Sequence, residues 1–87
     1  MNYQVRVRRV AQGQLDRLRG NDYQNVLKAI LALESEPRPS GCKKLAYPRL
    51  WRIRVGRYRV VYDMNDNESC IVVIHVTKRD ENTYKGL

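Results

Sequence analysis

The sequence predicts a small α+β domain in which a helical hairpin packs on one face of a mainly antiparallel sheet. An alternating, strand-like segment opens the chain, and two segments with helical spacing follow it. The second half holds three strand-like segments separated by turn residues. The predicted order of elements is therefore β-α-α-β-β-β. A chain of 87 residues suffices for one domain with a modest core, so residues 1–87 are expected to form a single domain.

The first half is predicted to supply one strand and both helices. Residues 3–10 alternate apolar and polar side chains, as a half-buried strand does. A short helix then runs to Gly20, and Asn21 or Asp22 is expected to cap a second helix. The second helix has an apolar stripe at a spacing of about 3.6 residues, formed by Tyr23, Val26, Leu27, Ile30, Leu31 and Leu33.

The second half is predicted to supply three strands after a connector over residues 38–47. The first two cover residues 50–55 and 58–63. Turn-forming residues at 64–68 separate them from a third strand over residues 69–77. The third strand is almost entirely apolar, which is typical of a strand that is central in a sheet or covered on both faces.

The strands on either side of Gly56-Arg57 are predicted to form a hairpin with a two-residue loop. This register puts Arg54 directly opposite Arg59, with Arg52 on the same face. Like charges directly opposite each other destabilise a sheet, so this open, concave and basic face is expected to bind a polyanion. The other face of the hairpin carries side chains expected in the core: Trp51, Ile53, Val55, Tyr58, Val60 and Tyr62.

The charge of the chain points to an acidic partner. Seventeen basic residues against nine acids give a net charge of +8, and twelve of the basic residues are arginines. This balance indicates binding to nucleic acid, an anionic membrane or an acidic protein. No apolar run approaches the ~20 residues of a membrane-spanning helix, and no signal-peptide pattern opens the chain, so we expect a cytoplasmic protein that does not bind membranes.

The two cysteines, Cys42 and Cys70, lack the spacing of a metal site. We expect two reduced thiols, as in a cytosolic protein, although the sequence also allows a disulfide between them. No metal ion and no cofactor are expected.

The segment over residues 50–62, with its Gly-x-Tyr-Arg-Val-Val-Tyr run, resembles the RelE group of the RelE/ParE toxin superfamily. The preceding Lys43-Lys44-Leu45 and the later Lys78-Arg79 also match the pattern of that group. The resemblance implies the toxin of a bacterial or archaeal type II toxin–antitoxin system. Such a toxin enters the ribosomal A site and cuts mRNA without a metal ion. It further implies a RelB-like antitoxin, whose acidic segment wraps the basic face and whose DNA-binding part carries the complex to operator DNA.

The resemblance also assigns roles to single residues. Arg52 and Arg54 correspond to two basic residues of the family's second strand, which are lysines in the best-studied members. Arg59 corresponds to the arginine of the family's Tyr-Arg-Val-Val-Tyr strand, Arg79 to one that protonates the leaving group, and Tyr84 to a tyrosine that stacks on a base. Arg59 and Arg79 also suit stabilisation of the phosphorane, because a guanidinium offers several fixed donors. Further contacts to RNA are expected from neighbouring basic side chains: Lys43, Lys44, Arg57 and Lys78.

The general base is left open by the sequence. Arginine at positions 52 and 54 is unsuited to this role, because its pKa stays above about 12. The alternatives are Lys78, His75, or no base at all, with the ribosome orienting the mRNA. Two other functions also stay open: a ParE-like inhibitor of DNA gyrase on the same fold, and a catalytically weakened member that acts mainly as a partner of antitoxin and operator.

Overall fold

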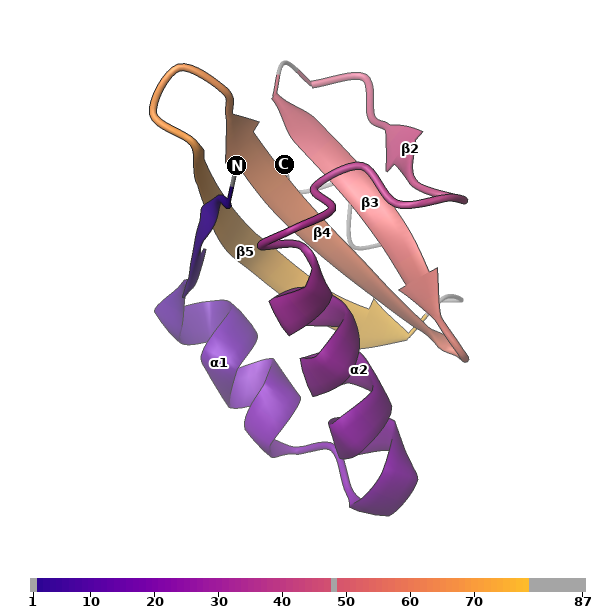
Figure 1. Cartoon of the computed structure of the whole chain (residues 1–87). Helices are drawn as coiled ribbons and strands as arrows, with labels where there is room; N and C mark the ends of the chain where they lie inside the picture. The colour runs from indigo at the N-terminus through magenta and orange to yellow at the C-terminus, as the bar shows by residue number, and fades with distance from the viewer. Residues whose placement is uncertain (1, 48, 79–87) are drawn as a thin grey trace.

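The computed structural model describes residues 2–47 and 49–78 and shows two helices lying against one face of a twisted sheet (Figure 1). The elements are β1 (Gln4–Val7), α1 (Arg9–Asp16), α2 (Gly20–Ala32), β2 (Lys43–Lys44), β3 (Leu50–Val55), β4 (Tyr58–Asn65) and β5 (Cys70–Lys78). The strands lie in the order β1-β5-β4-β3-β2. β1 runs parallel to β5, and the other neighbours are antiparallel. The predicted α+β class and mainly antiparallel sheet are confirmed.

The β3–β4 hairpin has the register that the sequence predicts. Arg54 pairs with Arg59, and Val55 pairs with Tyr58. Gly56 has φ = +59°, whereas Arg57 does not have a positive φ. A two-residue loop with glycine at a positive φ in its first position is typical of a type II′ turn, which follows the twist of the two strands.

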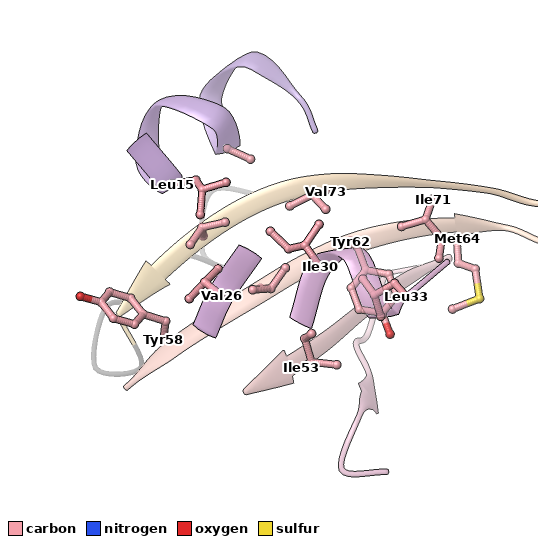
Figure 2. Packing of buried hydrophobic residues seen from close by; sticks show 13 residues of the cluster. Leu15, Val26, Ile30, Leu33, Ile53, Tyr58, Tyr62, Met64, Ile71 and Val73 are labelled. Carbon is pink, nitrogen blue, oxygen red and sulfur yellow. The ribbon is translucent and has the colours of Figure 1, made fainter. Parts of the chain in front are cut away.

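The core lies between the two helices and the sheet (Figure 2). Leu15 of α1 and Val26 and Ile30 of α2 pack against alternate residues of the strands, such as Tyr62 and Val73. These five side chains are at most 2% exposed. Burial of apolar area on this scale is the main stabilising contribution in a small domain.

A β-bulge in β5 changes which residues face the helices. Val61 pairs with His75 but Tyr62 pairs with Val73, so Ile74 is an extra residue in β5. Val73 and Val76 are both buried in the core, which strict alternation does not allow. Beyond the bulge, the side chain of His75 therefore lies on the face opposite the helices.

Three predicted boundaries in the first half are wrong, including the end of α1, which lies at Asp16 and not near Gly20. β1 ends at Val7, and α1 begins at Arg9, because helical packing starts earlier than expected, with Ala11 already fully buried. α2 begins at Gly20 and its N-cap is Arg19, without a side-chain capping bond, rather than Asn21 or Asp22. The Asp22 carboxylate instead accepts a hydrogen bond of 3.1 Å from the Tyr58 hydroxyl, which ties α2 to β4.

The predicted connector contains the short strand β2, which the sequence does not predict. Two residues are too few to show an alternating pattern. The three longer strands of the second half begin and end within two residues of their predicted bounds.

Candidate functional site

The sheet face opposite the helices gathers basic side chains from three neighbouring strands. Lys43 of β2 pairs with Arg52 of β3, and Arg54 of β3 pairs with Arg59 of β4. Directly paired residues project from the same face, and the intervening Ile53 is buried in the core. We call these four residues, Lys43, Arg52, Arg54 and Arg59, the basic face.

The basic face is less open at its centre than predicted. Arg54 and Lys43 are exposed, whereas Arg52 is only 7% exposed. Arg52 lies between Lys43 and Val61 in neighbouring strands, so side chains flank it on both sides. An arginine stays charged even when it is buried. The basic face therefore combines a positive charge fixed at its centre with accessible charges around it.

His75 lies beside the basic face, as the predicted parity suggested. It pairs with Val61, and Thr77 pairs with Arg59. Burial lowers the pKa of His75, and the charge of Arg8 lowers it further. The Nδ1 atom of His75 is buried and has no hydrogen-bond partner within the described part of the chain. A neutral imidazole of this kind can accept a proton near pH 7.

Two of the residues expected to contact RNA lie off this face. Lys44 pairs with Trp51, and its Nζ atom lies 6.0 Å from the centroid of the Trp51 ring. Lys78 pairs with the core residue Tyr58 and lines a cavity of about 350 Å³ on the helix side of the sheet. Both lysines lie away from the basic face because each pairs with a residue on the helix-facing side, and directly paired side chains project from the same face.

The remaining predicted residues are spread around the site. Arg57 is exposed in the turn between β3 and β4, at one end of the basic face. Arg79 and Tyr84 lie outside the residues that the structure describes, so their roles stay predictions.

A cavity of about 540 Å³ at the edge of the sheet was not predicted. It lies between α2, the connector and β3, and is lined by Ala29, Ala32, Gly41, Arg52 and Ile53 among others. β2 pairs only with Trp51 and Arg52, so it leaves the second half of β3 uncovered on this side. The small residues at positions 29, 32 and 41 are the feature of the sequence that could indicate this cavity. They are far from β3 in the sequence, and only folding brings them beside it.

The described residues contain no helix long and apolar enough to cross a bilayer. Within the same residues, no three His, Cys, Asp or Glu side chains gather closely enough to hold a metal ion. Cys42 and Cys70 are both free thiols.

Comparisons with known proteins agree with this architecture. The chain resembles RelE of an archaeal RelE–RelB complex from Pyrococcus horikoshii, with 29% identity, 93% of this chain and 99% of that chain covered, and a TM-score of 0.82. It also resembles a chain of the toxin–antitoxin complex RelBE2 from Mycobacterium tuberculosis, with 26% identity, 91% and 100% coverage and a TM-score of 0.79. The isolated E. coli RelE toxin shares the fold, at 22% identity, 97% and 93% coverage and a TM-score of 0.77.

No curated protein matches the chain. The family described as "ParE toxin of type II toxin-antitoxin system, parDE" matches residues 5–83, which is most of the sequence. The protein therefore belongs to the RelE/ParE superfamily and is the toxin of a type II toxin–antitoxin system.

Proposed function

We propose that this toxin is a ribosome-dependent endoribonuclease that cuts mRNA in the ribosomal A site and so inhibits translation. The observation that carries the proposal is the cross-strand pair of Arg54 and Arg59 beside the buried Arg52. Three guanidinium groups on one face of the sheet concentrate positive charge, and guanidinium groups bind the oxygens of a phosphodiester through charge-assisted hydrogen bonds. The likeness to RelE structures supports the same choice.

The proposed reaction is a transesterification within the RNA. The 2′-oxygen loses its proton and forms a bond to the adjacent phosphorus, and the bond from phosphorus to the 5′-oxygen breaks. The departing 5′-oxygen takes up a proton, which leaves a 2′,3′-cyclic phosphate and a 5′-hydroxyl. The guanidinium groups of Arg52, Arg54 and Arg59 would stabilise the negative charge that develops on the phosphorane. Arg79 keeps the role of leaving-group acid that the resemblance implies.

His75 is the best candidate for the general base in this proposal. It lies on the same side of the sheet as the arginines, whereas Lys78 lies on the helix side. Its lowered pKa favours the unprotonated imidazole near pH 7, which is the form that accepts the 2′-hydroxyl proton. Orientation of the mRNA by the ribosome would supply the rest of the rate enhancement.

The proposal includes partners and location. A RelB-like antitoxin would cover the basic face with an acidic segment, and its DNA-binding part would take the complex to operator DNA. The RelB-like partner is supported by the solved RelB–RelE and RelBE complexes to which the chain is similar. The toxin would act on ribosomes and mRNA in the cytoplasm.

A ParE-like inhibitor of DNA gyrase is the second candidate function. It is favoured by one observation, the match to the family described as the ParE toxin. A gyrase inhibitor needs a surface for a protein partner, and the cavity beside β3 offers mixed apolar and basic lining for one.

The deciding experiment expresses the chain without an antitoxin and maps cuts in a reporter mRNA by primer extension, with and without translation. We expect cuts only in the translated mRNA. Arg59→Ala should reduce cleavage by about a hundredfold or more, because it removes a preorganised donor to the phosphorane. Arg19→Ala is the matched control, since Arg19 is exposed at the start of α2, away from the basic face.

The other outcomes separate the alternatives. Growth arrest with uncut mRNA and a DNA-damage response would favour the gyrase inhibitor. Absence of growth arrest would favour a catalytically weakened member, in which arginines at positions 52 and 54 do not replace the lysines of active relatives. Retained antitoxin binding by Arg59→Ala would show that the variant is folded.

A further inference from the structure

We propose that Arg6 and Arg8 form a second contact site for RNA phosphates, which extends the basic face across the sheet to the β1 edge. The inference rests on the proposed function, since it names how the same RNA strand is held beyond the site of cleavage. No residue of this second site is among those that the sequence resemblance assigned to RNA.

The pairing of β1 with β5 sets the direction of both side chains. Val5 and Val7 pair with Ile71 and Val73, which are fully buried on the helix side of the sheet. Arg6 lies between them in sequence and pairs with Val72, so its side chain lies on the opposite face. Arg6 is also exposed to solvent.

Arg8 continues the same row. Its backbone is extended, with φ = −62° and ψ = 151°, and its N–H group donates a hydrogen bond of 3.0 Å to the carbonyl oxygen of Val73. Alternation therefore places its exposed side chain on the face that Arg6 occupies. Arg8 is also near enough to His75 for its charge to lower the pKa of the imidazole, after the larger effect of burial.

The bulge in β5 connects this row to the basic face. The extra residue, Ile74, turns His75 towards the side of the arginines, where it lies next to Val61 of β4. β5 lies between β1 and β4 in the sheet. Strands in a sheet are roughly 5 Å apart, so Arg8 and Arg59 belong to strands separated by about 10 Å. One RNA strand crossing the sheet would meet Arg54 and Arg59, then His75, and then Arg8.

One acid on this face, Asp63, is paired with an arginine. Asp63 shares a pairing row with Val72 and Arg6, and its carboxylate lies 3.0 Å from the Nη2 atom of Arg49. The pair reduces the negative potential that Asp63 would otherwise contribute to this end of the face. Asp63 therefore opposes the positive charge of Arg59 and Arg6 less than an unpaired carboxylate would.

RNA fits this surface better than an acidic protein does. The exposed residues of β1 on this face are Gln4 and Arg6, with Arg8 beyond the strand end, and they include no apolar side chain. Protein partners bury apolar area as well as charge, whereas a phosphate backbone can be bound through charge without apolar contacts. The apolar lining at the opposite edge of the sheet, beside β3, is the better surface for a protein.

The test measures binding of the full-length toxin to a single-stranded oligonucleotide made of 2′-O-methyl RNA, which lacks the attacking hydroxyl and stays uncut. The dissociation constant is measured between 50 and 200 mM salt for the wild type, Arg6→Ala/Arg8→Ala and Arg19→Ala/Lys28→Ala. Each phosphate contact in single strands contributes about 0.7 to the slope of log K against log salt, so loss of both arginines should lower the slope by about 1.4. The control removes two exposed charges from the helical side and should change the slope by less than half as much.

Equal changes in the two double variants would overturn the proposal, because they would show only a general effect of net charge. An unchanged slope with weakened antitoxin binding would overturn it in favour of an acidic protein. Charged residues on an edge strand also prevent unwanted strand pairing, and that role alone would leave the slope unchanged. Failure of the nuclease proposal is distinguishable, since uncut reporter mRNA does not alter the slope measured here, and a matching melting temperature shows that each variant is folded.

Discussion

At the scale of single residues, Tyr62 joins the core to the loop that follows α2. Its side chain is fully buried, and its hydroxyl donates a hydrogen bond of 2.8 Å to the carbonyl oxygen of Pro37. Burial raises the pKa of Tyr62, so the hydroxyl stays protonated at any physiological pH. The residue therefore contributes both apolar area and a polar tie to the folded state.

Tyr62→Phe isolates the polar tie. It should lower the free energy of unfolding by about 1 kcal/mol, because the ring still packs but the hydrogen bond is lost. In a domain of this size, that loss corresponds to a fall of roughly 4–8 °C in melting temperature. Urea unfolding measures it, with Tyr47→Phe as the control, since Tyr47 is 41% exposed. Equal stability of the two variants would contradict the assigned role.

His75 makes the stability of the fold depend on pH. It is the only histidine in the chain, and its pKa is lower in the folded protein than the ordinary value of about 6.5. Between the two pKa values, the unfolded chain binds more protons than the folded one. The free energy of unfolding should therefore decrease as the pH falls from 7 through the folded pKa.

Chemical unfolding at pH 7 and pH 5 tests this sign. The wild type should lose more stability over this interval than His75→Gln, which has no imidazole to protonate. A wild type that is as stable at pH 5 as at pH 7, or a His75→Gln variant that keeps the full decrease, would show that the imidazole is not the cause.

At the scale of elements, β5 depends on α1 beyond the end of its parallel partner. β1 pairs with β5 only from Cys70 to Val73, so the later edge of β5 is uncovered by β1. There the N–H group of Val76 donates a hydrogen bond of 2.7 Å to Oε1 of Gln14. The side chain of α1 thus supplies the acceptor that a longer β1 would have supplied.

Gln14→Leu should leave the Val76 N–H group without its acceptor and lower the free energy of unfolding by about 1–3 kcal/mol. Hydrogen exchange of the Val76 amide should accelerate at the same time. Gln12→Leu on the same helix is the control, because the bond from Gln12 to Asp16 is exposed and should contribute less than about 0.5 kcal/mol. An unchanged exchange rate of the Val76 amide would refute the role of Gln14 as its hydrogen-bond acceptor.

The elements that could be predicted are those in which local pattern and packing agree. The hairpin register followed from Gly56 and from the alternation on both sides of it, so Arg54 and Arg59 were correctly placed opposite each other. The bulge at Ile74 could not be predicted, because a run of apolar residues fits either face. The predicted N-cap of α2 is wrong because Asp22, a residue type that often caps helices, accepts a hydrogen bond from Tyr58 instead.

In the candidate site, the facing of side chains within a strand could be predicted, but the pairing of β2 with β3 and of β4 with β5 could not. Side-chain parity placed Arg52, Arg54 and Arg59 on one face, but it gave no information on β2, whose pairing decides that Lys43 joins them and Lys44 does not. The sequence predicts Lys78 as an RNA contact because it lies next to Arg79. Its pairing with Tyr58 depends on the register of two long strands, which the sequence does not specify.

At the scale of the whole molecule, charge opposes folding. The net charge of +8 is held in a body of 33 × 27 × 25 Å. The Debye length is about 30 Å at 0.01 M ionic strength and about 8 Å at 0.15 M. At low salt, repulsion therefore acts across the entire molecule, whereas near physiological salt it acts only between neighbours. Unfolding relieves this repulsion by moving the charges apart.

The free toxin should accordingly melt several degrees higher at 0.15 M than at 0.01 M sodium chloride, because screening removes a cost of the folded state. Arg19→Glu/Lys28→Glu lowers the net charge from +8 to +4 without changing the basic face. The rise in melting temperature between the two salt concentrations should therefore be smaller for this variant than for the wild type. Calorimetry at both salt concentrations measures the two differences. Salt screens attractive ion pairs, such as Arg38 with Asp66, as well as repulsion between like charges. An equal melting temperature at both salt concentrations would therefore contradict the prediction, because it would show that the two effects of salt cancel.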